Sequence, residues 1–272
     1  MIVSNVERSR LDKIFSAGLG VADATKCVSD KLIIKDNVLF LGDKKYNLTK
    51  QKKIFLISFG KAAYQMAKGA YKVLGKRITK GLIISNTQPK NKISNFKFIL
   101  STHPVPDERS LKAANSILNI LATTGKDDLV FFLISGGGSA MIALPDKNVT
   151  MEDKRITTQL LLRSGVDTNT LNTVRKKISK IKGGGLLKEA YPSKVITLIL
   201  SDVVGDKIDI IASGPSLPDK SSAKDAWREI CELGIENKLP PRVVINLENP
   251  IKEDIKKIKY PSHNTFLLGN TM

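Results

Sequence analysis

The chain has 272 residues, of which 42% are hydrophobic, so it is long enough for a large buried core in one or two domains. No apolar run approaches the roughly 18 residues that a membrane-spanning helix needs, and the amino-terminal residues lack the layout of a secretory signal. We therefore expect a cytoplasmic protein without a membrane partner. Cys27 and Cys231 follow no metal-binding or redox spacing, which predicts two reduced thiols.

The formal net charge of +18 suggests an anionic partner, which would be a nucleic acid, a membrane surface or a phosphorylated small molecule. The basic residues are spread from Lys13 to Lys259, aromatic residues make up only 6%, and no RNA-binding or zinc-finger motif occurs. This distribution favours a solvated, lysine-rich surface and predicts no specific nucleic-acid partner.

Strand-like and helix-like periods alternate along most of the chain. Thr150 and Asp153 form the pattern of a variant capping box at the start of one helix. In chain order, the periods predict a strand at 53–60, a helix at 61–75, strands at 78–85 and 96–102, a helix at 107–125, a strand at 128–135, helices at 150–163 and 171–181, a strand at 194–201, a helix at 222–234 and a weaker strand at 264–269.

This alternation predicts an α/β fold, a three-layer α/β/α Rossmann-like domain around a largely parallel sheet. In such a fold, ligands bind in the loops that follow the carboxyl ends of the strands. From about Asn237 the sequence becomes rich in proline and lysine, with one remaining strand-like run.

The first candidate loop places Lys61 between Gly60 and the opening turn of a helix. The helix dipole disfavours a cation there unless an anion lies nearby. A lysine that extends into solvent explains the position equally well.

The second candidate loop contains three consecutive glycines between two serines. Backbone N–H groups of such a loop can converge on an anion, with the hydroxyls as further donors. A tight turn that permits close packing is the equal alternative. The residues are Ser135, Gly136, Gly137, Gly138 and Ser139.

The third candidate loop follows the strand at 194–201, where Asp202 and Asp206 flank Gly205. Carboxylates in this place suit magnesium held through water, or acceptance of a proton from a substrate hydroxyl. A turn capped by aspartate is the simpler alternative. Ser213 and Gly214 form a second glycine-containing turn, and the helix at 171–181 supplies Asn172 and Arg175.

Several known motifs are absent from the sequence. No GxxxxGK[ST] occurs, and Met141 stands where the dinucleotide fingerprint requires glycine or alanine. Ser139, Asp202 and His263 occur in the order of an α/β-hydrolase triad, but "GGSAM" lacks the second glycine of a nucleophile elbow. His263 and His103 are the two histidines of the chain, and both are interpreted as structural.

Five segments together resemble the amino-terminal portion of the class II glycerate kinases, the glycerate 2-kinase family that carries a carboxyl-terminal MOFRL domain. The segments are "SFGKAA", "HPVPDE", "LISGGGSA", "NTVRKKISKIKGGGLL" and "LILSDVVGDKIDIIASGPSLPD", and they span roughly the first 220 residues. The resemblance implies a two-domain enzyme with its active site in the interdomain cleft. It also implies transfer of the γ-phosphoryl group of ATP, with Mg²⁺ or another divalent metal, to D-glycerate, which usually gives 2-phosphoglycerate.

Carried over by motif, Lys61 is the essential lysine and Asp202 the catalytic carboxylate. Asp206, from its place in the third candidate loop, is the candidate metal ligand. The residues that would bind substrate or nucleotide are Gly60, Ser135, Gly136, Gly137, Gly138, Ser139, Arg175, Ser213 and Gly214.

The sequence departs from the family pattern at Thr102, Gly185 and Ser216, which stand for glycine, arginine and threonine. We assign residues 1–238 to the amino-terminal domain, and residues 239–272 to a linker and the first strand of an incomplete second α/β domain. We therefore expect these 272 residues alone to bind ligands weakly, to turn over little and to self-associate, for example as a homodimer. The alternatives are a hydroxypyruvate reductase and a catalytically inactive ligand-binding fragment.

Overall fold

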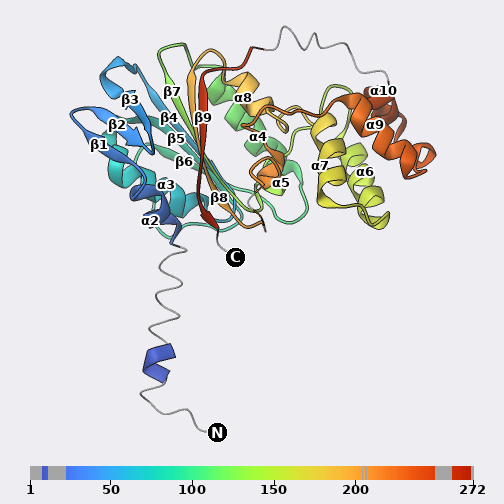
Figure 1. The fold of residues 1–272 in the computed structure, drawn as a ribbon, viewed down its shortest axis with the longest axis horizontal. Helices are drawn as coiled ribbons and strands as arrows, with labels where there is room; N and C mark the ends of the chain where they lie inside the picture. The colour runs from blue at the N-terminus through green and yellow to red at the C-terminus, as the bar shows by residue number, and fades with distance from the viewer. Residues whose placement is uncertain (1–7, 12–22, 204, 206, 249–258, 271–272) are drawn as a thin grey trace.

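The computed structural model describes residues 8–11, 23–203, 205, 207–248 and 259–270. Its centre is a six-stranded sheet in which every neighbouring pair of strands is parallel (Figure 1). Across the sheet the strands are β6 (Phe96–Leu100), β5 (Ile78–Ser85), β4 (Ile54–Phe59), β7 (Leu129–Ser135), β8 (Lys194–Ser201) and β9 (His263–Asn270).

The central strands β4 and β7 are buried along their whole length, and Ile57 pairs with Phe132 midway along them. A strand that is covered on both faces is a continuous apolar run, which is the pattern that predicts these strands. Because all six strands point the same way, the loops that follow β4, β7 and β8 meet at one edge of the sheet.

Helices cover both faces of the sheet. On one face, α3 (Ala63–Leu74) packs with α2 (Ala24–Ser29) in an apolar cluster that includes Met66 and Phe131. On the other face, α4 (Glu108–Leu121), α5 (Gly138–Met141) and α8 (Gly185–Glu189) pack in a second cluster that includes Ile117 and Phe132. The predicted three-layer α/β/α fold is confirmed.

Four further helices form a lobe beside these layers, at the right of Figure 1. Leu161, Val174, Ile230 and Val243, one from each helix, are fully buried together in a third apolar cluster. The helices are α6 (Met151–Arg163), α7 (Thr168–Lys177), α9 (Ala223–Glu232) and α10 (Pro241–Glu248). The capping box predicted at Thr150 and Asp153 is present at the start of α6.

The structure differs from the predicted elements in several places, among them the short helices α2, α5 and α8, which are not predicted. The helix predicted at 171–181 ends at Lys177, because Ser179 instead forms an antiparallel bridge with Pro145. Helix α10 begins with Pro241 and is not predicted. The sequence also does not predict the small antiparallel sheet of β1 (Ile33–Lys35), β2 (Val38–Leu41) and β3 (Lys44–Asn47).

Two elements of the segment 239–272 pack into the structure formed by the first 238 residues. Helix α10 packs against α9 and α6, and β9 is the edge strand of the sheet beside β8. The division into two domains stays a prediction.

Candidate functional site

The loops after β4 and β7 are joined at the carboxyl edge of the sheet. The backbone N–H of Lys61 donates to the carbonyl oxygen of Gly136 at 2.9 Å, and that of Ala62 donates to Ser135 Oγ at 3.0 Å. Gly60 has a φ of +124°, and a Cβ there would lie 2.3 Å from Ser135 Oγ. The close approach of the two loops therefore requires glycine at position 60, and it fixes Lys61 beside the glycine-rich loop.

Asp202, which follows β8, lies directly against this loop. A Cβ added to Gly136 would stand 1.7 Å from Asp202 Oδ2. A Cβ at Gly137 would stand 3.2 Å from Cγ of Lys61 and 2.9 Å from Cδ2 of His103. The structure thus brings Lys61, Asp202 and the glycine loop together, as the sequence predicts.

His103 is a member of this group that the sequence interpretation leaves out. Partial burial lowers the pKa of His103, and the charge of Lys61 lowers it further, whereas Asp202 acts in the opposite direction. The imidazole is therefore held in its neutral form at pH 7. Its position in the segment "HPVPDE", just beyond the carboxyl end of β6, is the signal that could have identified it.

The far end of the glycine loop carries a second polar group, centred on Ser139. Arg175 Nη2 donates to Ser139 Oγ at 2.8 Å, and Lys182 Nζ donates to the same oxygen at 2.5 Å. Ser139 Oγ lies 3.2 Å from Ser213 Oγ, which donates to Asn172 Oδ1 at 2.8 Å. Because Ser139 accepts from two cations, its own proton is directed to Ser213. Arg175 and Ser213 are thus brought together as predicted, and Lys182 is a participant that the sequence interpretation missed.

The turn at Ser213 has an unusual backbone. Ala212, Ser213 and Gly214 have φ values of 51°, 63° and 59°, all in the left-handed region. Left-handed backbone at a residue other than glycine stores strain, which persists when the surroundings impose it. Here the carbonyls of Ser213 and Gly214 accept the N–H groups of Gly183 and Gly184 at 3.0 and 2.8 Å. The strained turn therefore points the Ser213 hydroxyl at Ser139.

The backbone of the glycine loop offers unpaired donors. Within the described part of the chain, the N–H groups of Gly137, Gly138 and Ser139 have no hydrogen-bond acceptor. Gly137 has a φ of +78° and precedes the short helix α5, which begins at Gly138. These groups have the geometry expected of an anion cradle, between Lys61 and Arg175.

Two sequence predictions are not assembled here. The hydrolase arrangement is wrong, because His263 pairs with Val195 near the amino end of β8, six residues and roughly 20 Å from the end that precedes Asp202. Asp206, the predicted metal ligand, lies outside the described residues. Among the residues that are described, no cluster of three or more His, Cys, Asp or Glu side chains could hold a metal ion.

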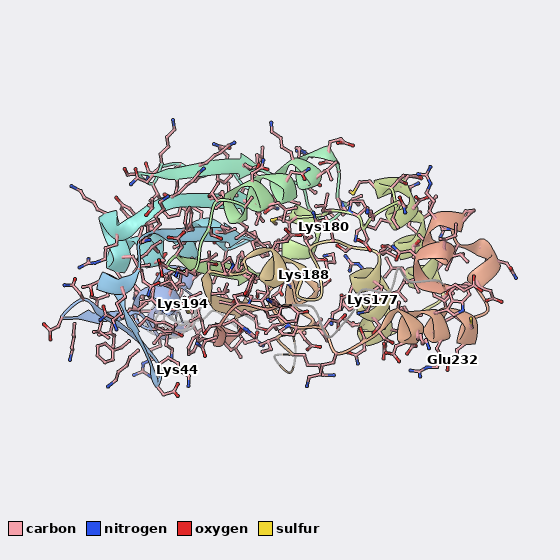
Figure 2. All side chains as sticks on the ribbon, turned by 90° about the horizontal axis from the view of Figure 1, so that it is seen from above. Lys44, Lys177, Lys180, Lys188, Lys194 and Glu232 are labelled. Atoms are coloured by element: carbon pink, nitrogen blue, oxygen red, sulfur yellow. The ribbon has the colours of Figure 1, made fainter. Side chains whose placement is uncertain are left out.

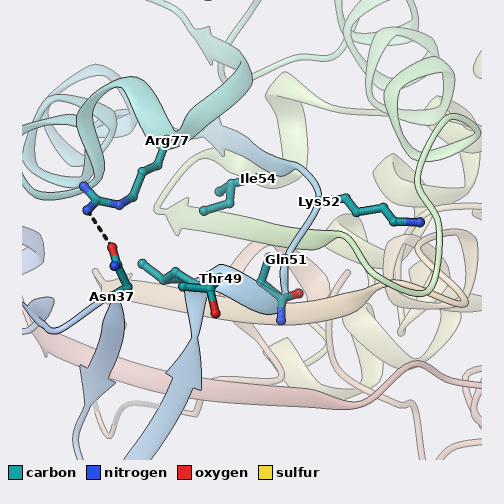
Figure 3. Close-up of a pocket in the computed structure, with 7 residues that line it drawn as sticks. Asn37, Thr49, Gln51, Lys52, Ile54 and Arg77 are labelled. Carbon is teal, nitrogen blue, oxygen red and sulfur yellow. Dashed lines mark hydrogen bonds between the residues drawn. The ribbon is translucent and has the colours of Figure 1, made fainter.

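A cavity of about 260 Å³ lies at the opposite, amino edge of the sheet (Figure 3). Ile54, the first residue of β4, lines it together with Leu48 and Lys52, and Arg77 Nη2 donates to Asn37 Oδ1 at 3.2 Å at its rim. It contains none of the candidate site residues, so we do not assign the chemistry to it.

The positive charge is distributed over the molecule. The labelled lysines of Figure 2 extend from Lys44 near the small sheet to Lys177 in the helical lobe. No helix within the described ranges is long and apolar enough to cross a membrane.

Comparison with known proteins identifies relatives of this chain. It is 41% identical over 199 residues to a D-glycerate 2-kinase of Thermotoga maritima, and the match covers 73% of this chain and 48% of that protein. It is 34% identical over 261 residues to a glycerate 2-kinase of Pyrococcus horikoshii, and that match covers 95% of this chain and 58% of that protein. The crystal structure of a glycerate kinase from Thermotoga maritima matches with a TM-score of 0.79 and 32% identity, over 95% of this chain and 57% of that one.

The chain spans about half the length of the curated relatives it matches. Residues 10–248 match the family model described as "Domain of unknown function (DUF4147)". The chain therefore belongs to the DUF4147 family, and its resemblance to the amino-terminal portion of the class II glycerate kinases is confirmed.

Proposed function

We propose that this chain takes part in the ATP-dependent phosphorylation of D-glycerate to 2-phosphoglycerate. The relatives named glycerate kinase support this reaction. The observation that carries the proposal is the meeting of Lys61, Asp202 and the unpaired N–H groups of Gly137 and Gly138 at one edge of the sheet. A cation, a carboxylate and an amide cradle are the groups that phosphoryl transfer needs, since that reaction depends mainly on positioning and charge neutralisation.

Each residue has a distinct proposed role. Lys61 Nζ and the N–H groups of the glycine loop bind the phosphoryl oxygens and balance the charge that develops on them. Asp202 orients the accepting hydroxyl of D-glycerate and accepts its proton. Gly136 has no side chain because the Asp202 carboxylate occupies that space. Ser135 and Gly60 hold the two loops together, and they act by positioning Lys61.

The residues present suit a magnesium ion that binds together with a nucleotide. Mg²⁺ is usually held by one or two carboxylates together with substrate phosphates and water, and does not need a cage made only of protein ligands. Asp202 is a half-buried carboxylate beside the proposed phosphate cradle, and it would hold the ion through water. When bound, the ion neutralises charge on the phosphates. Asp206 is the second proposed ligand.

The proposal includes an active site between two domains, of which residues 1–238 form the first and residues 239–272 begin the second. A chain of about half the length of its relatives would supply one wall of that cleft, which predicts weak activity and self-association. We also propose a cytoplasmic location, in keeping with the metabolites that the reaction uses.

A single-turnover experiment tests this function in the 272-residue chain. The chain, in excess over ATP labelled in the γ-phosphate, is incubated with Mg²⁺ and D-glycerate, and labelled 2-phosphoglycerate is separated from 3-phosphoglycerate and counted. We expect slow formation of labelled product that disappears in Lys61→Ala and Asp202→Asn variants. Transfer at the wild-type rate in either variant would contradict the role assigned to that residue.

The same samples separate the alternative functions. Oxidation of NADH with hydroxypyruvate, without labelled product, would support a reductase. Thermal stabilisation by ATP or D-glycerate would support an inactive ligand-binding chain if no labelled product forms, not even one equivalent per enzyme.

A further inference from the structure

Two basic side chains bind Ser139, and a third, Lys154, interacts electrostatically with both of them. Arg175 and Lys182 both donate to Ser139 Oγ, and Lys182 Nζ also donates to the Ser139 carbonyl oxygen at 3.1 Å. Lys182 is only 4% exposed. No ion pair joins Arg175, Lys182 or Lys154 to a carboxylate in the part of the chain that the structure describes.

Lys154, from helix α6, is the most unusual of the three. It is 6% exposed, and its Nζ is buried with no hydrogen-bond partner among the described residues. Burial lowers the pKa of Lys154 to about 7, the charge of Arg175 lowers it further, and Asp146 opposes the change. Burial, together with Arg175 and Lys154, also lowers the pKa of Lys182 well below its ordinary value. A buried ammonium group without a partner is costly, so it indicates a role that requires the charge.

Neighbouring lysines show that this lack of pairing is selective. Lys176 and Lys177, which follow Arg175 on α7, both bind Asp219, at 3.4 and 2.7 Å. The nearby carboxylate of Asp219 is therefore already paired with other lysines. Asp146 is the one acid coupled to Lys154, and it also accepts from Asn246 Nδ2 at 3.4 Å.

The charge balance favours a phosphate group as the missing partner. Three cations against one carboxylate leave an excess of two positive charges when all are ionised. A phosphate monoester carries a charge of about −1.5 to −2 at pH 7, whereas a carboxylate carries −1. A phosphate also offers three oxygens to the ammonium groups and to the remaining N–H groups of Arg175.

We propose that Lys154, Arg175 and Lys182, with Ser139 and Ser213, form a phosphate-binding subsite next to the site of Lys61 and Asp202. Arg175 and Ser139 are half-buried and give the ligand access, while the two lysines lie behind them. The source of the phosphate rests on the proposed function: it is either the nucleotide or the phosphorylated product.

Calorimetric titration of the 272-residue chain with inorganic phosphate, ADP and 2-phosphoglycerate tests the subsite. We expect the variants Lys154→Met and Lys182→Met, which keep side-chain length and remove charge, to weaken phosphate binding at least about tenfold. Without ligand, the unfolding temperature of Lys154→Met should stay equal to that of the wild type or rise, because a buried ammonium group without a partner has been removed. ADP or 2-phosphoglycerate should also bind these variants more weakly, and the one that does so identifies the source of the phosphate.

Lys176→Met is the matched control. It removes the lysine that follows Arg175 on α7 and is paired with Asp219, so it should lower the unfolding temperature and leave phosphate affinity unchanged. In addition, phosphate binding at pH 8, measured in two buffers of different ionisation enthalpy, should take up protons in the wild type and take up fewer in Lys154→Met.

Wild-type phosphate affinity in both lysine variants would overturn the subsite, even if phosphoryl transfer to D-glycerate is found. Conversely, phosphate binding that depends on Lys154 and Lys182 would support the subsite even if no transfer to D-glycerate occurs, and would leave only the proposed reaction in error.

Discussion

Replacement of Gly136 by alanine is a direct test of the position of Asp202. The backbone of Gly136 is not left-handed, so alanine suits it, and the change acts only through the new methyl group. That group would lie 1.7 Å from Asp202 Oδ2 and 2.1 Å from its Cγ. Ordinary van der Waals contact begins at 3.4 Å, so the carboxylate has to move by about 1.7 Å.

A displacement of this size has a predictable kinetic effect. A misplacement of about 1 Å in a catalytic group can cost about 100-fold in rate, so we expect the single-turnover rate of phosphoryl transfer to fall at least about 100-fold. Because Asp202 is half-buried and can swing away, stability should fall only by about 1 kcal/mol, at the low end for overpacking. Urea unfolding measures this second quantity.

Gly125→Ala is the control for the methyl group itself. The nearest atom to a Cβ there, Asp128 Oδ2, is 3.8 Å away, so the rate should be unchanged and stability equal or slightly higher. If the loss in Gly136→Ala acts through Asp202, the double variant with Asp202→Asn should lose little more than Asp202→Asn alone. Additive losses, or a folded Gly136→Ala protein that transfers at the wild-type rate, would refute the reasoning.

Four further substitutions test the site and other parts of the structure. Lys61→Ala and Asp202→Asn should each abolish measurable transfer and leave the urea midpoint unchanged; a lowered midpoint would instead indicate a structural role. Thr150→Ala removes the N-cap of α6 and should lower the free energy of unfolding by about 1 kcal/mol in urea, and an unchanged value would contradict the cap. Burial by itself raises the pKa of Asp219, but the hydrogen bond and charge of Lys177 outweigh it, so the pKa lies below its ordinary value of 3.8. This carboxylate therefore adds stability above pH 3.8 that is lost as the pH falls through its lower, folded-state pKa. Asp219→Asn should remove about 2 kcal/mol at pH 7 and flatten the acid side of the stability curve, and an unaltered curve would refute the pairing.

The strands and the main helices were predictable because local pattern decides them. The strands β4 and β7 are buried throughout, β8 is buried after its first residue, and all three contain apolar runs. Thr150 with Asp153 marks the start of α6. By contrast, β1 to β3 are only three or four residues long, and β1 and β3 carry exposed lysines, so these runs are too short to predict.

The candidate site was predictable only in part. Once the strands are known to be parallel, the loops that hold Lys61, Gly136 and Asp202 must share one edge of the sheet. His103 joins them from the loop after the edge strand β6, and only its place in the segment "HPVPDE" points to it, because a histidine by itself can be structural or functional.

The sequence by itself determined the alternation of strands and helices, the family, and the edge of the sheet at which polar loops gather, because periodicity and motif spacing are local properties. Only the tertiary structure decided which basic residues are paired with an acid and which are buried without one. Lys176, Lys177 and Lys182 belong to one lysine-rich stretch that looks uniformly solvated in sequence. The tertiary structure pairs the first two with Asp219 and buries the third beside Ser139, because burial depends on contacts between segments far apart in the chain.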